Sequence, residues 1–141
     1  MNNVMGVFDR LLMGSGNVVR LPGGFAVDAS GESFYQDALA AVADKHGTDR
    51  GWTHVEVELV AEDHGGVVLL VRGQPVGRLA RQDAAAYGPA VRARSGVRFV
   101  CAGMISEDWK RSRDARGFFR LILDLGLPQH CVAASAEPEP A

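Results

Sequence analysis

The sequence predicts a mostly β domain of the α+β class, in which a small antiparallel barrel or strongly curled sheet is closed by two helices. Three observations predict this fold. The chain of 141 residues is 47% hydrophobic, enough for one core without disulfide or metal cross-links. Six short segments have strand-like patterns and two have helical periodicity. Their order, β-α-β-β-β-α-β-β, lacks the strict alternation that builds a parallel sheet.

Residues 1–20 are predicted to form an amphipathic helix and a linker. Val4, Phe8 and Leu11 have helical spacing, and a Gly-Ser-Gly-Asn stretch follows closely. A short helix with one apolar face is expected either to be frayed or to dock onto a protein partner. With so few residues and two charges, it is a weak candidate for a leader or for a membrane-surface helix.

Residues 21–127 are predicted to form the barrel domain, which begins with a strand and a helix. The strand lies within 24–31, where apolar and polar residues alternate between glycines. The helix lies within 33–47, with Ser33 as its N-cap and Gly47 as its stop signal.

The middle of the domain is predicted to contain three strands. Residues 54–61 alternate valine and leucine with histidine and glutamate, which is typical of a strand with one face in solvent. Residues 67–71 and 76–80 form two further strands joined by a tight hairpin, in which Gly73 supplies the positive backbone dihedral.

The second helix is predicted to follow the hairpin directly. It is expected to break at Gly88 and Pro89, because proline lacks a backbone donor. Two more strands, within 97–105 and 117–125, complete the barrel. The remaining residues, 128–141, end in an acidic, proline-rich stretch and are predicted to be disordered.

The residues that carry chemistry are scattered. The four histidines have no metal-ligand spacing, and Cys101 and Cys131 form neither a paired-thiol motif nor a disulfide framework. No glycine-rich phosphate loop opens a helix, and no serine lies in a nucleophile elbow. We therefore expect a protein that is not an enzyme and has no metal or cofactor.

The apolar runs are far shorter than the ~20 residues that a membrane-spanning helix needs. The N-terminus has an acidic residue and no long apolar block before a cleavage site. No membrane association is expected. Two cysteines outside any disulfide framework fit a reducing compartment, so a cytoplasmic location is predicted.

The net charge of −2 conceals an uneven distribution of charge. Residues 72–120 contain eleven Lys and Arg against four Asp and Glu, whereas the rest of the chain contains four against thirteen. Two interpretations are open. The arginines are solvated and pair with the acidic segments in the fold, or they form one basic face that attracts a polyanion.

Two pairs of residues suggest a binding surface. Phe34 and Tyr35 lie where a strand enters a helix, and Arg78 and Arg81 flank the other strand-to-helix junction. Aromatic faces stack on exposed bases and guanidinium groups bind phosphate oxygens, a combination used by single-strand binders. Alternatively, one of the aromatics belongs to the core and the arginines are merely solvated.

Several stretches of the chain resemble the HIRAN family, particularly its small members in high-GC bacteria. They are GESFYQDAL, VLLVRGQPVGRLARQDAAAY, VCAGMI and GFFRLILDL, and together they span about residues 21–127. The resemblance implies a compact β-barrel related to the oligonucleotide-binding (OB) fold. In the DNA-repair helicases of this family, the domain grips the 3′ end of single-stranded DNA.

The resemblance also implies roles for individual residues. Phe34 and Tyr35 match the paired aromatics that follow the first strand of the family. Arg78 and Arg81 match the polar and basic positions of its VGxLxx element. Phe118 or the adjacent Phe119 lies near an aromatic of the last strand.

One loop departs from the family pattern. Family members usually have an Asn-Pro-Tyr-Asp-like loop between the second and third strands, whereas this chain has the shorter AEDHGGVV, with Asp63 as the remaining counterpart. Two functions follow. The first is a non-enzymatic module that binds single-stranded DNA or its 3′ end through the residues Phe34, Tyr35, Asp63, Arg78, Arg81 and Phe118. The alternative is a degenerate family member that binds protein and no nucleic acid.

Overall fold

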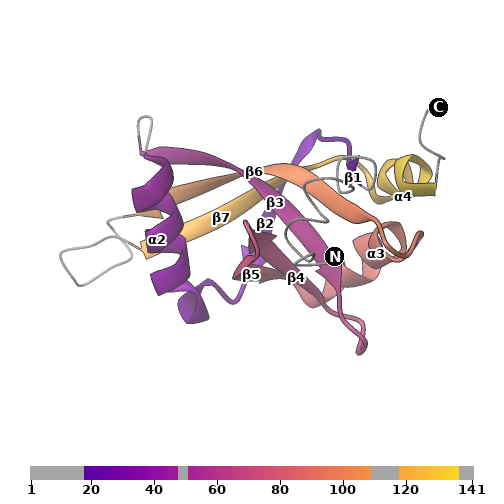
Figure 1. Ribbon diagram of the computed structural model, residues 1–141, viewed down its shortest axis with the longest axis horizontal. Coiled ribbons are helices and arrows are strands. Elements are labelled where there is room, and N and C mark those ends of the chain that lie inside the picture. The colour runs from indigo at the N-terminus through magenta and orange to yellow at the C-terminus, as the bar shows by residue number, and fades with distance from the viewer. Residues whose placement is uncertain (1–17, 48–50, 109–117, 137–141) are drawn as a thin grey trace, which may run out of the picture.

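The computed structural model describes residues 18–47, 51–108 and 118–136, which form a closed β-barrel with helices at its two ends (Figure 1). The strands are β1 (Val18–Arg20), β2 (Phe25–Ser30), β3 (Trp52–Ala61), β4 (Val67–Val71), β5 (Gln74–Leu79), β6 (Arg98–Asp108) and β7 (Phe118–Leu125). The helices are the 3₁₀ turn η2 (Glu32–Phe34) and the α-helices α2 (Gln36–His46), α3 (Arg81–Val91) and α4 (Pro128–Ala136). The predicted N-terminal helix lies outside the described residues.

Six antiparallel strands close the barrel in the order β6-β3-β4-β5-β2-β7, and β7 pairs back onto β6. This confirms the predicted fold class and all six predicted strands. Closure pairs the edges that an open sheet would leave unpaired. The long pairing of β3 with β6, from Trp52 opposite Ser106 to Leu59 opposite Phe99, forms one side of the wall.

Alternating side chains fill the interior of the barrel. The following core residues are at most 2% exposed: Val57, Leu59, Leu69, Phe99, Leu121 and Leu123. Packing is tight at Gly103 of β6, where a Cβ would lie only 2.7 Å from Cγ2 of Val57. Because the strands each contribute inward residues, the barrel has a single continuous core.

Strand β1 is an addition to the prediction, which assigned its residues to a linker. It pairs in parallel with the start of β6, from Val18 opposite Arg98 to Arg20 opposite Val100. The same edge of β6 pairs with β7 only from Ala102 onward. β1 therefore occupies the part of this β6 edge that β7 leaves unpaired. It was not predicted, because three residues are too few to show the alternation of a strand in the sequence.

Helix α2 begins later than predicted. Ser33, the predicted N-cap, lies inside the 3₁₀ turn η2, and the α-helix is preceded by Tyr35 without a side-chain cap. Gly31 has φ 75° and its carbonyl accepts the first hydrogen bond of the turn, from Phe34 N at 2.9 Å. The predicted stop at Gly47 is confirmed, since its N–H bonds to the Ala43 carbonyl at 2.9 Å.

Helix α3 is continuous, so the predicted break at Gly88 and Pro89 is wrong. Pro89 lies in the last turn, where its missing N–H removes only one helical bond. The residue before a proline usually avoids helical geometry because its Cβ meets the ring, and Gly88 has no Cβ. The helix is fixed to the barrel by Tyr87, whose hydroxyl donates to the Gly126 carbonyl at 2.7 Å.

Helix α4 corrects two predictions, the disordered tail over 128–141 and the count of two helices. Residues Pro128–Ala136 are helical and pack on α3 at the end of the barrel opposite α2 (Figure 1). Cys131 and Ser135 are completely buried. The prediction missed this helix for two reasons. The last residues of the segment are acidic, and α4 is stabilised by contacts with α3 that the composition does not reveal. Residues 137–141 lie outside the described part of the chain.

Candidate functional site

An exposed aromatic ring marks the junction between β2 and α2. Phe34 is the last residue of η2 and is 87% exposed. Its neighbour Tyr35 is half-buried and packs against the core. The structure thus separates the two predicted aromatics, with Tyr35 as the anchor and Phe34 as the ring available to a ligand.

The turn that carries Phe34 is fixed to strand β7. The Gln36 amide makes two bonds to the backbone of Phe119, donating to its carbonyl and accepting from its N–H, each at 2.8 Å. The carboxylate of Glu32 accepts from Leu121 N at 3.3 Å. These side chains bind the backbone of β7 as a neighbouring strand would. They fix the turn that carries Phe34 to this strand.

Arg78 lies next to this junction, on the outer face of β5. It pairs with Ser30 of β2 and with Val68 of β4. Its half-exposed guanidinium forms an ion pair with the Glu62 carboxylate. The pKa of Arg78 is raised, chiefly by a hydrogen bond with the Tyr35 side chain and also by the hydrogen bond and charge of Glu62, against the opposing effect of burial. Arg78 is therefore a cation next to the aromatic junction, with Glu62 as its ion-pair partner.

The loop between β3 and β4 supplies the carboxylate beside Arg78, but from an unexpected residue. Glu62 faces Arg78, whereas Asp63 is exposed and makes no hydrogen bond or ion pair with the described residues. The loop is a compact turn, closed by Glu62 N bonding to the Gly66 carbonyl at 2.8 Å. Arg92 of the segment after α3 donates to the Glu62 carbonyl at 3.3 Å. Asp63 is thus not brought into the cluster predicted from the sequence.

The other two predicted residues lie at the edges of the cluster. Arg81 is the exposed first residue of α3, and it makes no hydrogen bond or ion pair within the described part of the chain. Phe118 is the half-buried first residue of β7, directly before the backbone that binds Gln36. Both border the junctions that hold Phe34 and Arg78.

A hollow of about 500 Å³ separates the two strand-to-helix junctions. Gly31 and Glu32 line it where η2 begins, and Ala80 and Asp83 line it where α3 begins. Its lining contains three carboxylates, including Asp28, which pairs with Arg120 at 3.1 Å. An anion is therefore expected on the arginine side of the junction and not inside this hollow.

The buried thiols are poor nucleophiles. Burial raises the pKa of Cys101 to about 12 and also raises the pKa of Cys131. Among residues 18–47, 51–108 and 118–136, no three His, Cys, Asp or Glu side chains form a group that could hold a metal ion. Within the same residues, no helix is long and apolar enough to cross a membrane.

Comparisons with protein-family models, with curated proteins and with solved structures found no match to this chain. What the chain binds must therefore be inferred from its own side chains. Three of the predicted residues, Phe34, Tyr35 and Arg78, come together at one junction. The roles of Gln36 and Glu62 were missed, because both depend on contacts between segments that are distant in the sequence.

Proposed function

We propose that this chain is a non-enzymatic, HIRAN-like module that binds single-stranded nucleic acid at the Phe34–Arg78 junction. A base stacks on Phe34, and strand phosphates contact Arg78 and Arg81. The observation that carries the proposal is an 87% exposed aromatic ring on a turn that is hydrogen-bonded to β7, beside a half-exposed arginine on β5. Stacking on such rings tolerates any base, since every base has an aromatic face.

The binding mode that we propose runs along the strand and does not require a free 3′ end. The family's longer loop has no equivalent here, and its remaining counterpart, Asp63, makes no bond to the junction. The carboxylate at the junction is Glu62, which occupies Arg78 in the free protein. Glu62 therefore competes with phosphate for Arg78 and does not contact the 3′-terminal hydroxyl of a strand.

Replacing Phe34 by alanine should weaken the binding of a labelled single-stranded oligonucleotide about fivefold, equivalent to roughly 1 kcal/mol for the loss of one stacked base. Because the ring is 87% exposed, the melting temperature should stay unchanged. Fluorescence anisotropy measures the affinity. Phe25→Ala, which removes another exposed ring (56% exposed) on β2, is the matched control and should bind normally. Equal losses in both variants would contradict a specific stacking role for Phe34.

Replacing Glu62 by glutamine should tighten oligonucleotide binding about two- to fivefold, equivalent to roughly 0.5 to 1 kcal/mol, because Arg78 is released from an ion pair near the surface. Asp63→Asn is the control, since it removes the same charge from the next residue without touching Arg78. It should change the affinity much less. If Glu62→Gln weakened binding, or if both variants tightened it equally, Glu62 would not be competing for Arg78.

A further inference from the structure

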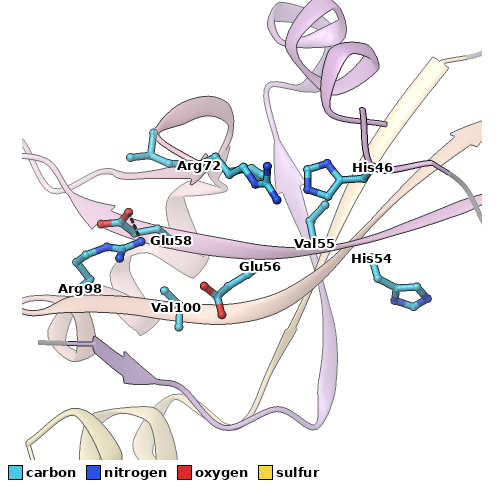
Figure 2. A pocket seen from close by; sticks show the side chains of 10 residues that line it. His46, His54, Val55, Glu56, Glu58, Arg72, Arg98 and Val100 are labelled. Carbon is cyan, nitrogen blue, oxygen red and sulfur yellow. Dashed lines mark ion pairs between the residues drawn. The ribbon is translucent and has the colours of Figure 1, made fainter. Parts of the chain in front are cut away.

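A separate hollow of about 470 Å³ opens where the end of α2 and the β4–β5 turn meet the outer faces of β3 and β6 (Figure 2). His46 lines it from α2 and Arg72 from the turn. Half-buried Leu70 supplies apolar surface from β4, whereas Val100 of β6 also lines the hollow but is only 1% exposed. The volume is in the range of sites for small organic ligands, which usually combine apolar walls with a few polar groups.

The acidic residues in this hollow are already neutralised. Glu58 pairs with Arg98 at 3.3 Å, as the dashed line in Figure 2 marks, and Glu56 pairs with Arg20 of β1. Their oxygens can still accept hydrogen bonds, since a carboxylate has several acceptor positions. Arg72 also lines the hollow and takes no part in these ion pairs. The hollow therefore offers a positive charge together with hydrogen-bond acceptors.

Arg72 has an unusual backbone for its residue type. It is the single non-glycine residue of the described chain with a positive φ, 51°, at a turn position where asparagine or glycine is preferred. Its guanidinium makes no hydrogen bond or ion pair with the described residues. The backbone conformation at this position is unfavourable for arginine, and the described fold does not use its charge. Arg72 is therefore a candidate for binding a ligand.

His46 lies on the same side of the hollow as the Arg72 guanidinium (Figure 2). Its Nδ1 is 3.0 Å from the Val42 carbonyl, to which it donates. This bond fixes the ring and leaves Nε2 available for a ligand. His54 also lines the hollow, but Figure 2 shows its ring turned away from the other side chains.

We propose that this hollow binds a phosphate-bearing ligand of nucleotide size. The phosphate lies at Arg72 and His46, because a guanidinium fork binds phosphate oxygens in pairs and Nε2–H of the doubly protonated His46 ring donates a further hydrogen bond while Nδ1–H remains on the Val42 carbonyl. The body of the ligand lies on Leu70. Its hydroxyl or amino groups donate to Glu56 and Glu58. The site is distinct from the Phe34–Arg78 junction and does not depend on the function proposed for that junction.

Titration of the full chain with adenosine 5′-monophosphate and with adenosine, by isothermal calorimetry, tests this proposal. The monophosphate should bind at least tenfold more tightly than adenosine. Arg72→Asn should remove most of that difference without lowering the melting temperature, because asparagine tolerates a positive φ. Arg120→Gln, which removes a surface cation on β7, should leave it intact. Equal affinities for the two compounds, or an Arg72→Asn variant that binds like the parent, would overturn the proposal.

A competition experiment identifies the source of the phosphate. If an unlabelled single strand displaces the monophosphate, the hollow accepts strand phosphates; if it does not, the hollow accepts free nucleotides. Removing Arg78 and Arg81 separates this site from the junction. If that variant lost oligonucleotide binding and kept monophosphate binding, the two sites would be independent, whereas loss of both would overturn the assignment of a separate site.

Discussion

The double variant Arg78→Ala and Arg81→Ala should bind a single-stranded oligonucleotide more weakly by roughly 1 to 3 kcal/mol and with a flatter salt dependence. Each phosphate that an arginine neutralises releases counterions, so the slope of affinity against salt concentration falls with each lost contact. The start of α3 adds a partial positive charge from its free backbone N–H groups, which favours a phosphate beside Arg81. Fluorescence anisotropy at two salt concentrations measures both effects.

The thermal stability of this double variant should change little, because Arg78 is partly exposed and its ion pair with Glu62 is a surface pair. Arg20→Ala is a suitable control. It also breaks a surface ion pair, with Glu56, but on a different part of the barrel. If the double variant melted at a lower temperature and bound as the parent does, the two arginines would be structural, and a protein-binding role would replace the one proposed.

Replacing Leu121 by alanine should reduce the free energy of unfolding by about 2 to 5 kcal/mol, because the vacated space cannot close in a tightly packed barrel. Leu121 is fully buried on β7, and its Cδ2 lies 3.6 Å from the position that a Cβ on Gly77 of β5 would occupy. Urea denaturation followed by circular dichroism measures the loss. Leu127→Ala, at a residue 37% exposed, is the control. A loss below 1 kcal/mol at Leu121 would contradict the packed interior.

The strands were predictable because their periodicity is local. In β3, His54, Glu56 and Glu58 lie on the outer face while Val55 and Val57 are buried, as the alternation requires. The return pairing of β7 onto β6 is a contact between strands, which patterns within one strand do not specify. The same reason explains why β1 and α4 were missed, since both exist through their contacts with β6 and α3.

The candidate site was predictable in part. Phe34, Tyr35 and Arg78 were chosen because they flank strand-to-helix junctions, and β2 and β5 are neighbours in the barrel. Asp63, which was chosen as the counterpart of the family's loop, does not reach Arg78, because β3 ends at Ala61 and the turn that follows sets the direction of each side chain. Glu62 reaches Arg78 as a result.

Binding of single strands along their length is the function proposed for the Phe34–Arg78 junction. Its most direct test is titration of the full chain with a labelled single-stranded oligonucleotide, with its 3′ end free or blocked, at two salt concentrations. We expect binding at low salt, weaker binding at high salt, and equal affinity for the oligonucleotides with free and with blocked 3′ ends. Absence of binding at low salt, or binding that requires the free 3′ end, would contradict the claim.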